Sequence, residues 1–417
     1  MLRNYLKITL AVMQRRKFFT FISLFGISMT LMILIVLTAF FEHIFGGKYP
    51  EVYRDRTLFG SMIEEVDTSN GNNAMRRGPM SLSYINKYVK TLKTPEKVAF
   101  STTPSTVNTY GNGKKLKLFF KYADPLFWEI TQFDFLEGKA FTQQNIDANE
   151  AVAVINDATR DDYFGKGVTA VGKIIEINGQ DLRVIGVVRG CPITRMMVAA
   201  DVYMPYHLQK RDPANTSNNG EYQVMVLAKS KADMAKVQAE YNAVTPRIPL
   251  PQDEFFHPQV LNAKLNPYFE SIVEDTFFNG SDGSARARFY VFSVVFALLF
   301  MSLPAINLVN INISRILERS SEIGIRKAFG ASSNTLVWQF IIENVMMTII
   351  GGGLALVLSG AFILWFNQSD LIPYADLTIN WKVVFVALLL SVVFGLMSGV
   401  FPAWRMSKLP VVDALKG

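Results

Sequence analysis

Residues 18–41 read FFTFISLFGISMTLMILIVLTAFF, which is 24 consecutive positions without a charged side chain. Three further stretches, 289–314, 344–369 and 383–404, also lack charged residues throughout. A helix needs about 20 predominantly apolar residues to cross the hydrocarbon layer of a membrane. Core helices of soluble domains rarely run this long without a charge. The sequence therefore predicts four membrane-spanning helices.

The first stretch has an alternative interpretation as a cleaved signal peptide, because Arg15, Arg16 and Lys17 precede it. The apolar core of a signal peptide runs for about 7–15 residues and ends at a cleavage site of small residues. Residues 18–41 exceed that length and no Ala-x-Ala sequence follows them, so we expect a retained helix. Residues 1–17 carry apolar side chains at helical spacing. They form either an amphipathic helix on the inner membrane surface or the extended base of the first helix.

The positions of the basic residues predict the orientation of these helices. Lys and Arg gather before the first helix, between the second and third, and after the fourth, whereas only Lys382 lies between the third and fourth. Loops rich in Lys and Arg stay in the cytoplasm. Both termini and residues 315–334 are therefore expected inside, with 43–287 and 370–382 outside. The expected segments are 1–17 (amphipathic), 18–42, 288–314, 335–369 and 383–404 (membrane helices), 43–287 (outer domain), 315–334 (cytoplasmic loop), 370–382 (short outer loop) and 405–417 (cytoplasmic tail).

The net charge of +7 follows the same topology. Residues 43–287 contain 28 basic and 28 acidic side chains, while the rest of the chain contains 14 basic and 7 acidic ones. The basic excess thus marks cytoplasmic segments, and no nucleic-acid partner is expected. The presence of only one cysteine, Cys191, excludes an internal disulfide and a cysteine-based metal cluster. We expect it to be an ordinary small residue and not a reactive thiol or a lipid-attachment site.

The outer domain shows signals of both strands and helices. Apolar and basic residues alternate over 115–122, and Asn178-Gly179 separates two strand-like runs, 173–177 and 182–188, as in a tight hairpin. Residues 222–227 read as a further strand. Apolar residues at helical spacing predict helices near 85–92 and 234–244. We expect an α+β domain, divided into two subdomains.

Catalytic signatures are absent from the sequence. It contains no G-x-x-x-x-G-K-[ST] phosphate loop and no G-x-S-x-G elbow. Its three histidines, His43, His207 and His257, stand in no H-E-x-x-H or comparable zinc motif. We therefore expect no catalytic residue, no bound metal and no cofactor in this chain, and a membrane enzyme has no constellation of residues behind it.

The cytoplasmic loop contains a patterned stretch, residues 316–331, which reads ILERSSEIGIRKAFGA. Charged and apolar residues alternate at helical spacing, and Gly330 is a typical C-cap. Ser332 or Ser333 would cap the following helix. From the pattern alone, a short amphipathic helix and a simple positive-inside loop are equally compatible with this stretch.

The stretch ERSSEIGIRKAFGAS, followed by Gln339-Phe340, Glu343 and Gly351-Gly352, resembles the FtsX-like permease domain of MacB-type ABC transporters. The ending Pro402-Ala403-Trp404-Arg405 with residues 410–415 is similar to that of the family. The outer domain is similar as well, from the stretch 127–141 through 151–156 to 202–205. The resemblance covers nearly the whole chain.

The resemblance implies a polytopic α-helical membrane protein with four transmembrane helices and a large α+β extracytoplasmic domain inserted between helices 1 and 2. It implies a bacterial inner-membrane permease that pairs with a second copy or a paralogue, and that binds a separate ABC ATPase subunit and a possible periplasmic adaptor. ATP and Mg would be bound by that ATPase, since only 17 residues precede the first helix here. The implied substrate is a drug, a peptide or a lipoprotein. The alternative is an ATPase-driven regulator of cell-wall hydrolases, whose outer domain is usually smaller.

Two groups of residues are expected to matter for such a function. The first would form the coupling helix that docks on the ATPase, through Glu318, Arg319, Glu322, Ile323, Gly324, Ile325, Arg326, Lys327, Phe329 and Gly330. The second would allow close packing of membrane helices, through Gly351, Gly352, Gly395 and Gly399. Mere tolerance of small residues is an equally good reading of these glycines.

Overall fold

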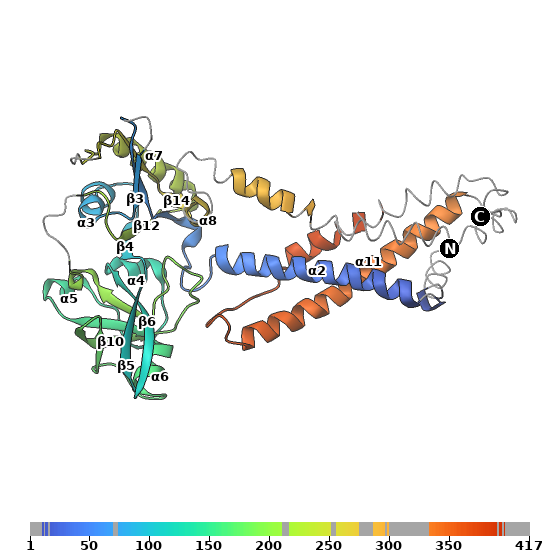
Figure 1. The fold of residues 1–417 in the computed structure, drawn as a ribbon, viewed down its shortest axis with the longest axis horizontal. Coiled ribbons are helices and arrows are strands. Elements are labelled where there is room, and N and C mark those ends of the chain that lie inside the picture. Colours follow the sequence, from blue (N-terminus) through green and yellow to red (C-terminus); the bar gives the residue numbers. More distant parts are fainter. Residues whose placement is uncertain are drawn as a thin grey trace. The chain divides into compact units, whose positions relative to one another are not determined.

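The computed structural model describes residues 11, 13–15, 17–69, 74–210, 217–251, 256–274, 287–296, 298–299, 333–389, 392–393 and 396. The chain forms two compact units (Figure 1). The sheet unit consists of Ile44–Tyr290 with Ile372–Ala375. The helical unit consists of Met1–His43, Val291–Leu371 and Asp376–Gly417. Each unit is described by itself below.

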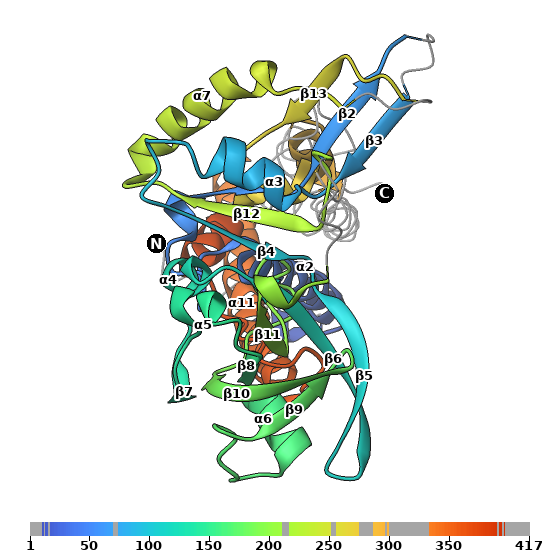
Figure 2. The same ribbon diagram turned by 90° about the vertical axis from the view of Figure 1, so that its left-hand side faces the viewer.

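The sheet unit is built on an 11-stranded sheet in the order β14-β1-β12-β4-β6-β11-β8-β10-β7, with β5 paired to β6 and β9 paired to β10 (Figure 2). A second sheet has the order β13-β2-β3. The strand bounds are β1 Thr57–Gly60, β2 Ile63–Asp67, β3 Ala74–Gly78, β4 Lys97–Thr102, β5 Ser105–Gly111, β6 Lys114–Ala123, β7 Phe135–Gly138, β8 Val152–Asn156, β9 Ile174–Ile177, β10 Gln180–Val188, β11 Val202–Pro205, β12 Tyr222–Leu227, β13 Val260–Ala263 and β14 Asn266–Pro267.

Short helices flank these strands. They are α3 Leu82–Tyr84, continued by a π-helical turn at Ile85–Val89, then α4 Leu126–Thr131, α5 Gln143–Asp147, α6 Asp157–Phe164, α7 Met234–Val244 and α8 Tyr268–Ile272. Single 3-10 turns lie at Arg54–Arg56, Tyr206–Leu208, Lys231–Asp233 and Thr245–Arg247. Helix α6 begins where the Asn156 side chain accepts a hydrogen bond from the backbone amide of Thr159, as expected of an N-cap.

The large sheet is continuous but narrows at its middle, where β4 and β6 share only the pair Ser101↔Ala123. One buried cluster packs around β12 and α7, and another around β8 and β10. A third cluster, rich in aromatic side chains such as Phe127 and Trp128, fills the region of α4. The two expected subdomains thus share one sheet, because a single residue pair keeps its two halves hydrogen-bonded.

Most elements expected from the sequence are confirmed within this unit. The 173–188 hairpin is present as β9 and β10, and its turn residues Asn178 and Gly179 have φ values of 53° and 72°. The alternating stretch lies in β6, and α7 has the predicted bounds. The helix near 85–92 is shorter than expected. It ends at Val89, since the amide of Lys90 bonds back to the carbonyl of Ile85 in a wide π-type turn.

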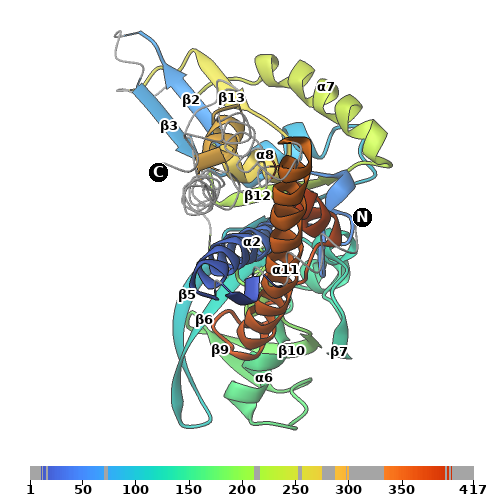
Figure 3. The ribbon, with the colours of Figure 1, turned by 90° about the vertical axis from the view of Figure 1, so that its right-hand side faces the viewer.

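The helical unit contains α2, Lys17–Phe45, and α11, Ser333–Gln368 (Figure 3). Both include a segment long and apolar enough to cross a membrane, at Thr20–Phe45 and Ile341–Gln368. A shorter apolar helix spans Ala287–Phe296, and residues 381–389 are also helical. The described residues cover the second and fourth expected spans only in part, so the count of four stays a prediction.

Candidate functional site

The residues that the sequence singled out are only partly within the described residues. The expected coupling helix, from Glu318 to Gly330, lies outside them, as do Gly395 and Gly399. Gly351 and Gly352 are described, and so are the points at which the chain passes between the two units. The structure therefore describes two parts of the candidate site, the residues at these crossing points and the residues at which the helices pack.

Gly351 and Gly352 both lie where α11 approaches another helix. A Cβ atom added at Gly351 would lie 2.7 Å from Cγ2 of Ile27, on α2. One added at Gly352 would lie 2.5 Å from Cδ1 of Leu388, on the helix 381–389. By contrast, nothing lies within 4 Å of the same position at Gly353. Two adjacent glycines thus let α11 pack closely against two different helices at one level.

Polar and aromatic contacts hold the far end of the same helix group. Asn380 donates a hydrogen bond to Oε2 of Glu42 at 2.7 Å, and the rings of Phe40 and Phe366 meet edge to face at 4.9 Å. The side-chain amide of Asn367 also pairs with the backbone of Leu377. These contacts fix the C-terminal ends of α2 and α11 to the chain that follows α11.

The chain leaving α2 is held in the sheet unit by a group of buried charges, Glu51, Arg54 and Arg195, which we call the arginine clamp. All three side chains are at most 5% exposed. Nη1 of Arg195 lies 3.0 Å from Oε2 of Glu51, and Arg54 forms a second ion pair with the same oxygen. One carboxylate thus binds two guanidinium groups in the interior.

The arginine clamp also binds the end of α2 directly. Nη1 of Arg54 donates to the carbonyls of Ile44 and Gly46, each at 2.9 Å, and Arg195 reaches the Gly46 carbonyl at 3.4 Å. The last carbonyls of a helix have no partner within the helix and carry partial negative charge. The guanidinium groups satisfy them, so the end of α2 is fixed in position by charge.

An aromatic cluster next to the arginine clamp lies at two of the points where the chain passes between the units. The ring of Phe269, in α8, packs edge to face against Phe45 at 5.0 Å and against Phe289 at 5.3 Å. Phe45 ends α2, and Phe289 lies in the helix Ala287–Phe296. The guanidinium group of Arg54 also stacks over the ring of Tyr268, 3.7 Å from its centroid. Helix α8 therefore connects the end of the first helix with the start of the next one.

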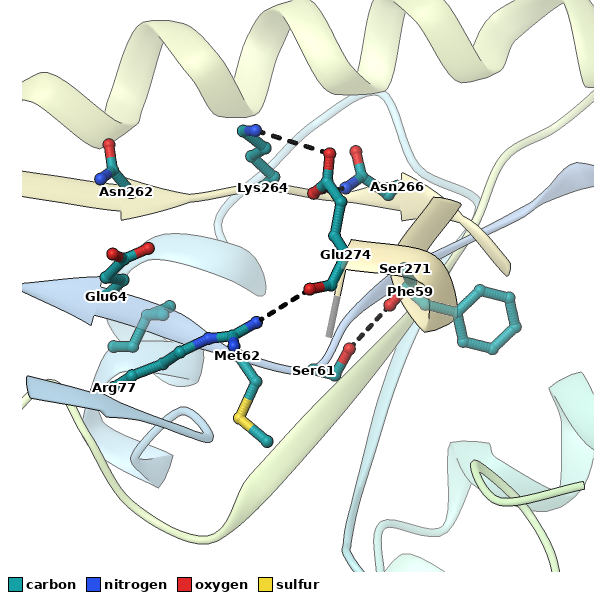
Figure 4. Close-up of a pocket in the computed structure, with 11 residues that line it drawn as sticks. Phe59, Ser61, Met62, Glu64, Arg77, Asn262, Lys264, Asn266, Ser271 and Glu274 are labelled. Atoms are coloured by element: carbon teal, nitrogen blue, oxygen red, sulfur yellow. Dashed lines mark hydrogen bonds and ion pairs between the residues drawn. The ribbon is translucent and has the colours of Figure 1, made fainter. Parts of the chain in front are cut away.

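A small polar cavity of about 40 Å³ lies on the other side of α8 (Figure 4). Glu274 accepts a hydrogen bond from Asn266 at 2.7 Å and pairs with Lys264 at 3.6 Å, and its backbone carbonyl accepts from Arg77 at 3.4 Å. Ser61 and Ser271 share a hydrogen bond of 2.7 Å. The cavity has room for ordered water. The side chains that surround it fasten α8 and the residues after it to both sheets.

A larger cleft of about 490 Å³ opens where the two halves of the large sheet meet. Hydroxyl and amide groups dominate its lining, with one basic and one acidic residue. The lining residues are Pro79, Thr102, Thr103, Ser105, Phe120, Tyr122, Asn178, Gln180, Gln209, Lys210, Gly220 and Glu221. The volume is in the range of small-molecule sites.

Two ionisable groups of the sheet unit have pKa values that burial shifts strongly, Cys191 and Lys121. Burial raises the pKa of the Cys191 thiol to about 12, so it stays protonated and is a poor nucleophile. Burial lowers the pKa of Lys121 to about 7, and its Nζ donates to the Met197 carbonyl at 2.6 Å. Among the described residues, no group of three or more His, Cys, Asp or Glu could hold a metal ion.

No sequence pattern predicts the arginine clamp or the network around Glu274. Arg195 is 144 residues from its partner Glu51, and no local motif joins them. The one local signal is a pair of opposite charges, Glu51 and Arg54, about 10 and 13 residues after the end of an uncharged run.

The chain matches two family descriptions in succession. Residues 20–244, more than half of the chain, match the MacB-like periplasmic core domain. Residues 294–411 match the FtsX-like permease C-terminal domain. The first match covers α2 and most of the sheet unit, and the second covers the expected coupling helix.

Relatives of known name are similar over about two thirds of this chain. The uncharacterized ABC transporter permease YknZ of Bacillus subtilis is 26% identical over 67% of this chain and 65% of its own length. YvrN of the same organism is 28% identical over 70% and 68%. The macrolide export ATP-binding/permease protein MacB of Escherichia coli O157:H7 is 25% identical over 69% of this chain but only 42% of its own.

A solved structure resembles part of the chain. The periplasmic region of MacB from Actinobacillus actinomycetemcomitans is 15% identical, covers 45% of this chain and 84% of that one, and has a TM-score of 0.34. The two family matches together decide the assignment. The chain belongs to the family of MacB-type, FtsX-like permeases of ABC transporters.

Proposed function

We propose that this chain is the membrane subunit through which a separate ATPase moves the sheet unit outside the membrane, and so drives export or extraction of a substrate. The observation that supports this most is the arginine clamp. Burying three charges is costly unless they are paired and hydrogen-bonded. Here they bind the end of a membrane-spanning helix, at the place where force would pass into the sheet unit.

The direction of the proposed coupling follows from the topology. The chain would cross the bacterial inner membrane four times, with both termini in the cytoplasm and the sheet unit outside. The end of α2 and the start of the helix Ala287–Phe296 are joined through Phe269. A displacement of one of these helices would therefore displace the other and α8 together.

The ATPase would dock on residues 315–334, where charged groups such as Arg326 give specificity and apolar groups such as Ile323 fill a pocket. ATP and Mg would be bound by that partner, because this sequence contains no phosphate loop. Two permease subunits, identical or paralogous, would pair, and a periplasmic adaptor would complete the assembly in some members.

The substrate class follows only from relatives. MacB is named for macrolide export, and drugs, peptides and lipoproteins are the candidate substrates here. The alternative, a regulator of cell-wall hydrolases, is not preferred, because the MacB-like periplasmic core match covers most of the sheet unit.

The test of this proposal is assembly with an ABC ATPase, for which the genes adjacent to this one are the first candidates. We expect the two chains to co-purify and to hydrolyse ATP, and we expect the double variant Ile323→Asp with Arg326→Glu to lose the ATPase. A matched control, Lys408→Glu with Leu409→Asp, places the same charges on the cytoplasmic tail and should keep it. If both double variants assembled and transported equally well, the coupling role of residues 315–334 would be wrong.

A further inference from the structure

One short segment of the sheet unit comes from the far end of the chain. Ile372–Ala375 belongs to the sheet unit, although the residues on both sides of it belong to the helical unit. Tyr374 lies six residues after Gln368, the last residue of α11, and seven before the helix 381–389. The segment thus leaves the helices, contacts the sheet unit and returns.

Tyr374 is held there by three groups, Asp157, Ala158 and Gly190, which we call the Tyr374 socket. The phenol donates a hydrogen bond to Oδ1 of Asp157 at 2.6 Å and accepts one from the backbone amide of Ala158 at 3.2 Å. The amide of Gly190 donates to the same carboxylate oxygen at 2.9 Å. Burial, followed by the bond to Asp157, raises the pKa of Tyr374 above its ordinary range, so the phenol stays a donor.

The shape of the socket depends on a glycine. A Cβ atom added at Gly190 would lie 2.2 Å from Cζ and 2.4 Å from Cε2 of the Tyr374 ring. No side chain larger than hydrogen therefore fits at position 190 while the ring is bound. Gly190 has no positive φ that would require glycine for another reason, within the described residues. The contact with the ring is thus the reason for glycine at this position.

The backbone of Tyr374 also indicates that the contact is specific. Its φ is 61°, in the left-handed region that residues with side chains avoid. Such a conformation persists only where surrounding contacts hold it in place. Simple packing of an exposed loop would require neither this conformation nor a half-buried phenol bound to a carboxylate.

We propose that the Tyr374 socket is a binding site for the loop between the third and fourth expected membrane helices, and that it is a further point at which those helices hold the sheet unit. This inference rests on the proposed function, since it assigns a second path for the same movement. Tyr374 is a positioning residue in this scheme. Its six-residue distance from α11 limits the slack to about 20 Å of extended chain.

The first experiment tests the socket without reference to transport. In the full chain in detergent, hydrogen exchange is measured at the amides of Ala158 and Gly190. We expect Tyr374→Phe to speed exchange at Ala158 by about tenfold or more, because the amide loses its acceptor. Gly190→Ala should expel the ring and give the same result. Tyr110→Phe, on a 73% exposed tyrosine of the same unit, is the matched control. If the Ala158 amide exchanged at the same rate in Tyr374→Phe and Tyr110→Phe, the proposed socket would be wrong.

The second experiment tests the attachment. Spin labels are placed at Asn112 and Leu371 in a Cys191→Ser background, and their distance is measured in the complex with the ATPase, with and without ATP. We expect an ATP-dependent change that falls at least about twofold in Tyr374→Phe and not in Tyr110→Phe. If the ATP-dependent change in label distance were as large in Tyr374→Phe as in the unmodified chain, the socket would transmit no movement and the proposal would be overturned.

The two failures are distinguishable. If no ATP-dependent change occurred even with Tyr374 intact, the proposed function and the transmitting role would both be wrong, while faster exchange in Tyr374→Phe would still establish the socket.

Discussion

Replacing Glu51 by Gln should destabilise the sheet unit strongly, because it removes the one carboxylate that binds two buried guanidinium groups. Glutamine has nearly the same shape, so the change creates no cavity. It leaves Arg54 and Arg195, 5% and 1% exposed, without their anionic partner. The effect is therefore electrostatic.

Its size follows from the burial. Removing one partner of a buried ion pair costs about 3–5 kcal/mol, because the remaining charge stays desolvated. The carbonyls of Ile44 and Gly46 still accept from Arg54 and reduce the loss. We expect a decrease of about 3 kcal/mol in the free energy of unfolding, which is a large share of the about 5–15 kcal/mol of a typical domain.

The assay uses the full chain in detergent. Trp128 is in the sheet unit, in α4, so its fluorescence during denaturation reports on that unit in a background where the other four tryptophans are Phe. The control is Glu96→Gln, which breaks a 2.6 Å ion pair with Arg56 whose acid is 38% exposed. Exposed pairs contribute about 0–1 kcal/mol. Equal losses in the two variants would refute the reasoning, since burial would then not decide the cost.

The remaining predictions concern helix packing, a buried amine and α8. Gly351→Ala should lower the thermal stability of the full chain, because the added Cβ would meet Ile27. Gly353→Ala is the control. It should be neutral or stabilising by up to about 1 kcal/mol, because a glycine within a helix there gains a methyl group in open space. Burial lowers the pKa of Lys121 from an ordinary 10.5 to about 7. Between pH 7 and pH 10.5 the unfolded chain therefore binds more protons than the folded chain. The free energy of unfolding should rise with pH over this range, by at most about 1.4 kcal/mol per pH unit. Denaturation of Lys121→Met at pH 7 and pH 9 should show that this rise has disappeared, and an unchanged rise would assign it to another group. Asn266→Ala should loosen α8 through loss of its 2.7 Å bond to Glu274, seen as faster hydrogen exchange in 268–272, while Gln143→Ala, which removes an exposed bond, should not affect those residues.

Local patterns in the sequence were sufficient to predict several elements. The Asn178-Gly179 turn, the alternating strand in β6 and the spacing of apolar residues in α7 each depend on residues close in the sequence. The long uncharged runs likewise identify α2 and α11 without tertiary information. Each of these signals reflects either a local preference of the backbone or the need for apolar side chains in lipid. A single stretch of sequence can meet either condition without help from residues elsewhere in the chain.

The candidate site depends on pairs of residues that are far apart. Asp157 and Tyr374 are 217 residues apart, and Gly190 is needed only because the ring of Tyr374 comes to lie over it. A glycine, a tyrosine and an aspartate in separate stretches of sequence give no periodic signal. The narrowing of the sheet at Ser101↔Ala123 is equally a property of strand order, which no segment encodes by itself.

In the proposed scheme, the helices act on the sheet unit through two different elements. Phe45 and Phe289 both contact Phe269 of α8, so the first and second helices would act on one point. The Tyr374 socket lies on α6 and on the chain just after β10. A body held at a single point can swivel, whereas one held at two separated points is constrained in orientation as well as in position. Besides reducing the ATP-dependent change, Tyr374→Phe should therefore broaden the distribution of distances between labels at Asn112 and Leu371 even without ATP. Phe269→Ala should impair the ATP-dependent shift without this broadening. If both variants only shifted the mean distance by the same amount, a single attachment would account for the coupling, and the division between α8 and α6 would have no mechanical meaning.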